Sequence, residues 1–396
     1  MENVIGKLLG IEISKLEECN GLNTAREIVQ QPGAWKESIK NLVNNKDEIK
    51  IFIDSFLDKK DYRIILTGAG TSAFAGEVCE PYLTKLLNRR VEAIATTDLV
   101  SNPTSYFIKD VPTLLVSFAR SGNSPESVHA VNLATRLIDE LYQVVITCNE
   151  DGKLAKNTVD DKKSLLLLMP SQTNDLGFAM TSSFTTMVLN AMAIFNIDKI
   201  ENFSDDVEKL NETVNNFLEN NIDKVTQLVN EDFERIVYLG SSTSKGIARE
   251  SALKVLELTA GKVNASYDTP LGFRHGPKSV VDDTTVSVVY VSNDEYTRKY
   301  DLDLIKEMLA HKKKDKVVIV GDNIDDEIVN KADYLFNVKN IEYSIDNEVF
   351  LPLQQIIFGQ LLSFLKSINL GITPDNPCPT GEVNRVVQGV ILHDLV

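Results

Sequence analysis

Short apolar runs that alternate with helical segments constrain the fold of this chain more than any other feature of its sequence. The first half contains four such runs, each followed by a turn and a longer segment with helical spacing, at residues 63–67, 113–118, 143–148 and 164–169. Runs of this length and composition are typical of buried parallel strands joined by crossover helices. The first half is therefore predicted to fold as a doubly wound parallel α/β sheet.

The same alternation restarts in the second half, after a polar stretch at residues 200–230 whose helical spacing indicates a connector. Four further strands and a helix are predicted, at residues 235–239, 286–291, 316–320, 334–338 and about 353–366. Both halves contain the order strand, Gly/Ser/Thr loop, helix, with Leu66-Thr67-Gly68 in the first and Tyr238-Leu239-Gly240 in the second. The sequence thus predicts two copies of one α/β unit.

The pattern divides the chain into consecutive segments. We expect an N-terminal helical segment without strands (residues 1–45), a first α/β domain (46–200), a helical connector (201–230), a second α/β domain (231–370) and a C-terminal tail (371–396). Within the N-terminal segment, residues 24–27 resemble a helix start and residues 30–33, which include Pro32 and Gly33, a helix stop.

Composition excludes several classes of protein. The formal net charge is −16 and no basic patch stands out, which argues against a nucleic-acid partner. The four cysteines are scattered without a CxxC pair, as is typical of free thiols in a reducing compartment. The start of the chain does not resemble a signal peptide and no apolar run approaches eighteen residues, so we expect a cytoplasmic protein without a membrane span.

One predicted helix combines charges with an apolar surface. Residues 247–258 (IARESALKVLEL) place apolar side chains on nearly all sides of the helical wheel, as in a buried helix. Glu250, Lys254 and Glu257 lie at i, i+4 and i+7 and so line one face. A solvated salt-bridge ladder is one interpretation. Charges in a buried helix need partners or a chemical task, however, and we favour the task.

Three loops rich in small and hydroxyl side chains could bind a phosphate: Gly68–Ser72, which includes Thr71, Arg120–Ser124, which includes Ser121, and Thr181–Ser183, which includes Ser182. Backbone N–H groups, hydroxyl donors and the positive end of a helix dipole suit a phosphate. The first loop lacks the third glycine of a dinucleotide fingerprint, and no Walker lysine follows it.

Each loop also has a simpler interpretation. Ser124 and Ser182 could be helix N-caps, and Arg120 could be a surface arginine. Three such loops at the carboxyl edge of one sheet nevertheless favour a ligand site, because open α/β sheets bind ligands at that edge.

Together these motifs resemble the sugar isomerase (SIS) domain family, through GAGTS, SFARSGNSPES, TSSFTT, ARESALKVLELTAGK and FRHGPKS. Within the family, the chain is most similar to the galactosamine-6-phosphate deaminase/isomerase group, long described as tagatose-6-phosphate ketose/aldose isomerases. The resemblance covers roughly residues 45–390. It implies two tandem SIS domains, each a parallel doubly wound sheet sandwiched by helices.

The resemblance also implies roles for single residues. Glu257 matches the C1/C2 proton-transfer base in the isomerase half of glucosamine-6-phosphate synthase, with Glu250 and Lys254 as supporting charges. His275 matches the ring-opening histidine, which in the family comes from the neighbouring subunit, so an active homodimer is expected. The serines and threonines that hold the sugar phosphate correspond to Thr71, Ser72, Ser121 and Ser124.

Three departures from the synthase bear on function. Arg120 replaces a neutral glutamine, and Arg385 lies in the tail region where the synthase has a lysine, so we expect Arg385 to contact substrate or tail and the tail to contribute to the active site. No glutaminase domain precedes the SIS pattern, and residue 2 is Glu2 instead of a nucleophilic cysteine. Release of ammonia, or plain isomerisation, is therefore favoured over glutamine-dependent synthesis.

The main hypothesis is an enzyme that converts galactosamine 6-phosphate to tagatose 6-phosphate and ammonia. A histidine such as His275 can assist ring opening near pH 7, and one carboxylate with a pKa raised by burial, here Glu257, can move a proton between C1 and C2. No metal or other cofactor is expected, because the sequence holds no ligand cluster with metal spacing. The alternatives are an aldose/ketose isomerase of a sugar 6-phosphate and, less favoured, a sugar-phosphate-binding regulator.

Overall fold

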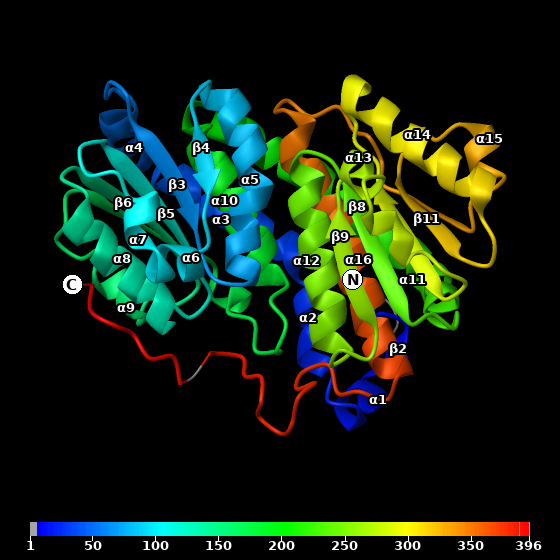
Figure 1. Cartoon of the computed structure of the whole chain (residues 1–396). Helices are drawn as coiled ribbons and strands as arrows, with labels where there is room; N and C mark the ends of the chain where they lie inside the picture. The colour runs from blue at the N-terminus through cyan, green and yellow to red at the C-terminus, as the bar shows by residue number, and fades with distance from the viewer. Residues whose placement is uncertain (1–5, 388, 396) are drawn as a thin grey trace. The chain divides into compact units, whose positions relative to one another are not determined.

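Figure 1 shows a computed structural model of the chain, which describes residues 6–387 and 389–395. These residues group into two compact units, each built on a five-stranded parallel sheet. The β3 unit contains Gly33–Asp175, Ser182–Ser204 and the described residues from Thr380 onward. The β8 unit contains the described residues up to Pro32, Leu176–Thr181 and Asp205–Pro379. The packing thus divides the N-terminal segment after Pro32 and the C-terminal tail after Pro379, which differs from the predicted boundaries.

In the β3 unit the sheet has the order β4–β3–β5–β6–β7. Its strands are β3 (Arg63–Thr67), β4 (Val91–Ala93), β5 (Thr113–Ala119), β6 (Leu141–Thr147) and β7 (Ser164–Leu168). Alternate residues of these strands point to opposite faces. Ile65, Leu115 and Val145 pack against α6 (Thr96–Ser101), α8 (Pro125–Leu137) and α9 (Lys153–Lys156).

Helices also cover the other face of this sheet (Figure 1). They are α3 (Gln31–Asn44), α4 (Lys46–Leu57), α5 (Thr71–Leu87) and α10 (Ser182–Ile194). The indole N–H of Trp35 donates to Thr185 Oγ1 at 3.0 Å, which joins α3 to α10. Short helical turns complete the unit: α7 (Pro103–Tyr106), η1 (Ser171–Thr173) and η2 (Ile197–Lys199).

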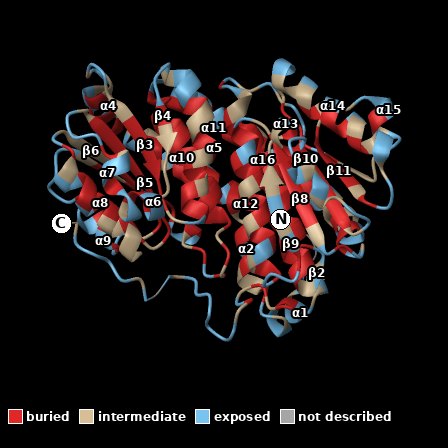
Figure 2. Cartoon of the chain, viewed as in Figure 1, coloured by how far each residue is buried: buried red, intermediate tan, exposed pale blue. Residues whose placement is uncertain are grey.

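In the β8 unit the corresponding order is β9–β8–β10–β11–β12, again entirely parallel. The strands are β8 (Arg235–Gly240), β9 (Asn264–Asp268), β10 (Thr285–Tyr290), β11 (Lys316–Gly321) and β12 (Tyr334–Asn337). One face packs against α13 (Pro270–Phe273), α14 (Glu295–His311) and α15 (Asp326–Val329). The other side holds α12 (Thr243–Leu258) and α16 (Asn347–Asn369), which are packed together; α16 is almost wholly buried and α12 mostly so (Figure 2).

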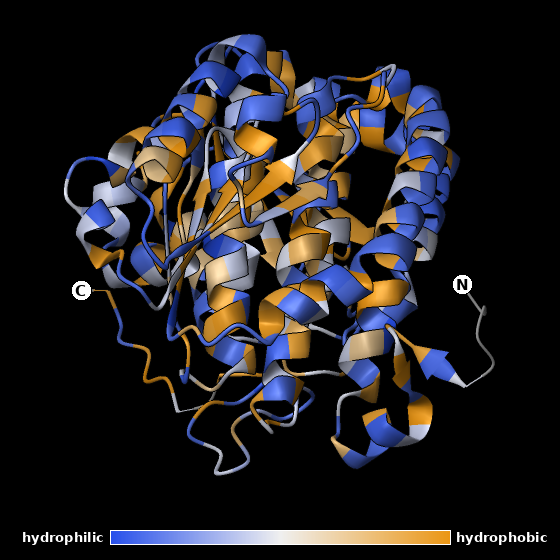
Figure 3. Cartoon of the chain, turned by 90° about the vertical axis from the view of Figure 1, so that its right-hand side faces the viewer, coloured by the Kyte–Doolittle hydropathy of each residue, from blue (hydrophilic) through white to orange (hydrophobic). Residues whose placement is uncertain are grey.

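The remaining elements of the β8 unit surround this core. They are a small hairpin of β1 (Lys7–Leu8) and β2 (Ile11–Glu12), the helices α1 (Ile13–Glu18) and α2 (Leu22–Val29), and the turn η3 (Pro277–Val280). The long helix α11 (Ile200–Val229) coincides with the predicted helical connector (201–230), and its residues from Asp205 onward belong to this unit. Figure 3 shows apolar residues gathered inside and polar residues on the outer helices.

The predicted fold class is confirmed, and each of the eight predicted strands is present. The edge strands β4 and β9 were not predicted, because VEA and NASYD are short and half-polar. The expectation of no strand in the N-terminal segment is wrong, since β1 and β2 pair there. The predicted stop at residues 30–33 does end α2, but α3 begins at once, because proline is tolerated in the first turn of a helix.

The expectation that no segment could span a membrane overlooked α16. This helix is long and apolar enough by composition, but 94% of its most apolar window is buried inside the structure. Its polar side chains form hydrogen bonds there: Gln355 accepts from the Ser244 hydroxyl at 2.6 Å, and Gln360 accepts from Gln31 at 2.7 Å. The helix therefore serves as the core of the β8 unit.

Candidate functional site

The loop after β3 is shaped by two glycines. A Cβ atom on Gly68 would lie 2.5 Å from the backbone of Ser72, so only glycine allows so tight a turn. Gly70 has φ 56° and ψ −129°, a conformation that side chains rarely adopt. The turn places Thr71 and Ser72 in the first turn of α5, where both are buried. The start of a helix and two hydroxyl side chains therefore meet at this edge of the sheet.

The loop after β5 leaves the same edge, because β5 is the parallel neighbour of β3. Its main chain is held in place by Asn149, whose amide donates to the Ser121 carbonyl at 2.8 Å. Ser124 occupies the N-cap position of α8, yet its hydroxyl makes no cap and donates to Ser127 Oγ at 2.6 Å. The simple N-cap interpretation of Ser124 is therefore wrong.

Arg120, next to this loop, is only 7% exposed, so the surface interpretation is also wrong. Its guanidinium donates to the main-chain oxygen of Arg385 at 2.8 Å. The Arg385 side chain in turn donates to the carbonyl of Asp175 at 2.9 Å and to Asn174 Oδ1 at 3.3 Å. Arg385 thus attaches the C-terminal tail to Asn174 and Asp175, and its contact with substrate stays a prediction.

The third predicted phosphate loop has a structural role. Ser182 is fully buried, and its hydroxyl donates to a carboxylate oxygen of Asp175. The same carboxylate accepts the backbone N–H of Ser183 at 2.9 Å and its hydroxyl at 2.6 Å. Thr181 is also buried, and its carbonyl accepts from Gln360 at 3.4 Å. An acid already occupies the start of α10, which favours the helix-capping interpretation of Ser182, and the phosphate-binding role of Thr181 and Ser182 stays a prediction.

The loop after β8 repeats the backbone geometry of the loop after β3. Ser242 has φ 52° and ψ −128°, nearly the values of Gly70. The hydroxyls that surround it are engaged by acceptors. Ser241 donates to Asp301 at 2.8 Å and Thr243 to Glu348 at 2.7 Å. Carboxylates at this loop disfavour an anion, which restricts the candidate phosphate site to the β3 unit.

The predicted charged face of α12 forms a compact cluster. Lys254 Nζ lies 3.2 Å from Glu250 Oε1 and 2.5 Å from Glu257 Oε2. The side chains of Lys254 and Glu250 are fully buried, whereas that of Glu257 keeps 23% of its exposure. Burial lowers the pKa of Lys254, but the two carboxylates raise it by more, so the net pKa lies above its usual value and the ammonium stays charged.

Glu257 is therefore not buried as expected. It is the member of the cluster whose carboxylate reaches the surface, while Glu250 is the enclosed one. A carboxylate that reaches the surface and is held by a buried ammonium can exchange a proton with a bound molecule. The solvated-ladder interpretation is wrong, since the cation is fully buried.

His275 lies in the exposed turn between α13 and η3. The turn is well anchored: the Thr269 hydroxyl caps α13 by accepting the Gly272 N–H at 3.0 Å, and the His275 N–H donates to the Gly272 carbonyl at 2.9 Å. Arg274 pairs with Glu307 of α14 at 2.9 Å. The imidazole is thus presented to the outside from a fixed backbone.

Sequence reasoning missed two residues that organise these elements. Asp175 caps α10, and the only local signal was an acid seven residues before a serine pair. Tyr290 of β10 lies 2.7 Å from the Ser251 hydroxyl on α12, and a Cβ on Gly359 of α16 would lie 2.4 Å from the same hydroxyl. No local pattern predicts this contact, because its members lie far apart in the sequence.

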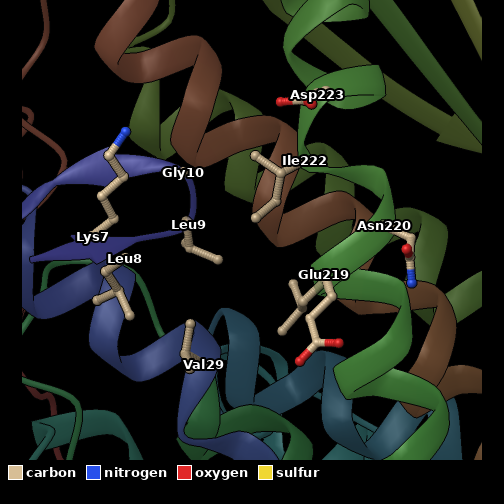
Figure 4. Close-up of a pocket in the computed structure, with 10 residues that line it drawn as sticks. Lys7, Leu8, Leu9, Gly10, Val29, Glu219, Asn220, Ile222 and Asp223 are labelled. Carbon is tan, nitrogen blue, oxygen red and sulfur yellow. The ribbon is translucent and has the colours of Figure 1, made fainter. Parts of the chain in front are cut away.

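The β8 unit also contains a pocket of about 460 Å³ between the β1–β2 hairpin and α11 (Figure 4). Leu8, Leu9 and Ile222 form apolar walls, and none of the predicted site residues lines it. Lys7 at its rim pairs with Glu12 at 3.2 Å. We assign no chemistry to this pocket.

Known proteins resemble the whole chain. The family model of the SIS domain matches residues 56–197 and 228–346. D-galactosamine-6-phosphate deaminase AgaS from Escherichia coli is 43% identical over 378 residues, which cover 94% of this chain and 96% of that protein. A solved tagatose-6-phosphate ketose/aldose isomerase, also from Escherichia coli, has a TM-score of 0.86 at 42% identity and covers 94% of this chain and 97% of its own.

A solved structure from Clostridium novyi is similar to an even greater extent. It has a TM-score of 0.95 at 47% identity and covers 98% of this chain and 99% of its own. The two regions matched by the family model contain the two parallel sheets, β3–β7 and β8–β12, so the resemblance noted in the motifs extends to both units. The chain belongs to the SIS domain family.

Proposed function

We propose that this chain is an enzyme that converts D-galactosamine 6-phosphate and water to D-tagatose 6-phosphate and ammonia. The observation that carries the proposal is the α12 cluster, in which Lys254 is fully buried and Glu257 reaches the surface. Relatives from Escherichia coli and Shewanella that bear the name D-galactosamine-6-phosphate deaminase AgaS are 43% and 41% identical over nearly the full chain, which supports the substrate.

In the proposed site the 6-phosphate binds at the carboxyl edge of the β3 sheet. Thr71 and Ser72 place hydroxyls at the start of α5, and the loop of Ser121 and Ser124 places further hydroxyls at the start of α8. The Arg120 guanidinium supplies a formal positive charge next to them. These donors suit a phosphate dianion, since charge-assisted hydrogen bonds are stronger than neutral ones.

The proposed chemistry opens the sugar ring and then moves one proton. His275 donates a proton to the ring oxygen and takes up the proton that the C1 hydroxyl gives up, and the open aldehyde results. Glu257 takes the proton from C2 and returns it to C1, while O1 gains a proton from solvent and the amino nitrogen loses one to solvent, which leaves an imine at C2 and a hydroxyl at C1. Water adds to the imine carbon and ammonia leaves, so that C2 becomes the ketone of tagatose 6-phosphate.

We further propose that the enzyme acts as a cytoplasmic homodimer and that His275 serves the neighbouring subunit. The exposed position of His275 on an anchored turn supports this arrangement, because a partner chain can reach the imidazole without rearranging its backbone. Two of the free cysteines, Cys79 and Cys148, are buried, which fits a reducing compartment.

Ammonia release from galactosamine 6-phosphate tests the proposal, with glucosamine 6-phosphate as the matched epimer. We expect turnover of the galacto compound and at least about tenfold weaker kcat/KM for the gluco compound, since a misplaced hydroxyl leaves polar groups of the site without partners. No ammonia from either amino sugar would reject the deaminase assignment.

The second candidate is an aldose/ketose isomerase without loss of nitrogen. It is favoured by the name of the solved Escherichia coli relative, a tagatose-6-phosphate ketose/aldose isomerase. Incubation of tagatose 6-phosphate alone, followed by analysis for an aldose 6-phosphate, distinguishes the two. Turnover there, without ammonia release from galactosamine 6-phosphate, would establish the isomerase.

A further inference from the structure

The C-terminal segment of the β3 unit, described for residues 380–387 and 389–395, lies on the surface with few buried side chains. Val383, Val387 and Ile391 are 54%, 53% and 78% exposed, so hydrophobic burial contributes little to holding the segment in place before Leu395, which packs against the core of the unit. Hydrogen bonds of its backbone and of one arginine therefore account for much of its attachment. Segments attached in this way detach at low free-energy cost unless specific contacts fix them.

Arg385 provides such a contact, and its target is rigid. Its Nε and Nη2 atoms both donate to the Asp175 carbonyl, and Nη2 also reaches Asn174 Oδ1 at 3.3 Å. The Asp175 carboxylate is itself fixed by the serines at the start of α10, and the Cys148 thiol donates to the Thr173 carbonyl at 3.3 Å. The forked guanidinium thus attaches the C-terminal segment to a firmly held turn.

The main chain of the same residue faces the proposed phosphate site. The Arg385 carbonyl accepts from Arg120 Nη2 at 2.8 Å, and Arg120 directly precedes Ser121 of the loop after β5. Because the guanidinium is planar, an acceptor that holds Nη2 restricts the directions in which its other donors can point. Without it, Arg120 would lose more side-chain entropy when it bound an anion.

We propose that Arg385 is a positioning residue for phosphate binding: its side chain fastens the C-terminal segment to Asn174 and Asp175, and its carbonyl thereby holds Arg120 in the orientation that receives the sugar phosphate. This inference rests on the proposed function, because it assumes that the loop after β5 binds the phosphate. Every substitution of Arg385 keeps the carbonyl and removes only its anchor, so such variants test positioning itself.

The first test compares Arg385→Ala with Arg385→Lys and the unchanged chain. For Arg385→Ala we expect about a tenfold increase in the KM for galactosamine 6-phosphate and in the inhibition constant of inorganic phosphate, with kcat within about twofold, because one charge-assisted contact is weakened. Arg385→Lys should recover part of the loss, since lysine can donate to the Asp175 carbonyl but lacks the fork. A fall in kcat with unchanged KM would overturn the proposal.

Arg136→Ala is the matched control. Arg136 also donates to the tail, at the Leu395 carbonyl 3.3 Å away, but it has no contact with Arg120 among the hydrogen bonds of the described residues. The Arg136→Ala variant should leave the KM for galactosamine 6-phosphate and the inhibition constant of inorganic phosphate within about twofold of the unchanged chain. An equal effect of Arg136→Ala would mean that tail attachment in general, and not the position of Arg120, matters, and would overturn the assignment to Arg385.

A double variant separates positioning from a merely structural role. Arg120→Gln alone should raise both constants at least as much as Arg385→Ala, and Arg120→Gln with Arg385→Ala should be no worse than Arg120→Gln alone. Coupled residues show such non-additivity. Multiplied effects in the double variant would contradict the proposal.

A readout without turnover keeps this inference distinct from the proposed function. Inorganic phosphate should raise the Tm of the unchanged chain, and Arg385→Ala should need about tenfold more phosphate for the same rise, with an unliganded Tm near that of the parent. If the chain releases no ammonia yet this shift in phosphate dependence is seen, the proposed function fails and the inference stands. An unchanged phosphate dependence would overturn the inference whatever the activity.

Discussion

At the scale of single residues, the chemistry depends on how α12 distributes burial over three charges. Lys254 and Glu250 are enclosed, and Glu257 alone reaches the surface. The buried ammonium therefore acts as a fixed counter-charge, while the carboxylate at the surface is the group that can contact a substrate. This division could not be read from the i, i+4, i+7 spacing, which treats the two glutamates alike.

We expect Glu257→Gln to lower kcat by about 10²–10⁴-fold, the usual contribution of a general base, because the amide cannot accept the C2 proton. The inhibition constant of inorganic phosphate should stay within about threefold of the parent value, since the proposed phosphate donors lie in the β3 unit. Steady-state ammonia assays and phosphate inhibition measure both effects. A variant with near-normal turnover would show that another group is the base.

The Lys254→Met variant tests the buried pair. It removes the ammonium 3.2 Å from the enclosed Glu250 and should lower the free energy of unfolding by about 3–5 kcal/mol, while Lys254→Met with Glu250→Leu should recover much of the loss. Urea denaturation of the single and double variants, at matched pH, measures this. A double variant less stable than the single one would contradict this account of the pair.

The pH dependence of this pair follows from the raised pKa of Lys254. A group whose pKa is higher in the folded than in the unfolded chain contributes its full stability below the unfolded value, usually 10.5, and loses it only as the pH rises through the folded value. The stability difference between the parent and Lys254→Met should therefore show no lysine titration from about pH 6 to 9 and should shrink above about pH 10.5.

At the scale of elements, the loops after β3 and β8 share one backbone conformation but differ in the side chains that contact them. Gly70 and Ser242 share nearly the same φ and ψ, and Gly68 and Gly240 each approach the serine four positions later. In the β8 unit, Asp301 and Glu348 accept the hydroxyls of the loop. The pKa of Asp301 lies above its usual value, because burial raises it by more than the hydrogen bonds from Ser292 and Ser241 lower it.

This equivalence predicts opposite effects of two substitutions. Ser242→Gly should raise the free energy of unfolding by about 0.5–2 kcal/mol, because relief of a strained backbone exceeds the entropy cost of glycine. Gly70→Ser should lower it by about 1–3 kcal/mol. Gly33→Ala, a helical glycine with open space around it, is the control and should stabilise by up to about 1 kcal/mol through chain entropy alone. Destabilisation by Ser242→Gly would argue against strain at that residue.

At the scale of the whole molecule, the proposal makes the dimer part of the catalyst. If His275 serves the partner's Glu257, a mixture of Glu257→Gln and His275→Ala chains contains heterodimers with one complete site. Random exchange of equal amounts makes half of the dimers mixed, so about one quarter of the parent activity should return, because activity depends on the number of complete sites. Each variant alone should remain inactive. Failure to recover activity after verified subunit exchange would place both residues in one chain's site.

The fold class and most of the helices and strands follow from the amino-acid sequence alone. Apolar runs such as 63–67 and 235–239 could be assigned as strands from local sequence, because a buried parallel strand and the turn after it need apolar and then small residues within a short stretch. The same local signals identified the Gly68–Ser72 turn and the charged face of α12. The short edge strands β4 and β9 could not be predicted, since they bury too little apolar surface to differ in sequence from loops.

Which polar groups form hydrogen bonds with one another depends on the tertiary structure. Ser182 and Ser124 look alike in the sequence, yet one donates to Asp175 and the other to Ser127. Arg120 meets a carbonyl 265 positions away, and Ser241 a carboxylate 60 positions away. A buried hydroxyl or guanidinium donates to an acceptor that tertiary packing places near it, and that acceptor can lie far away in the sequence.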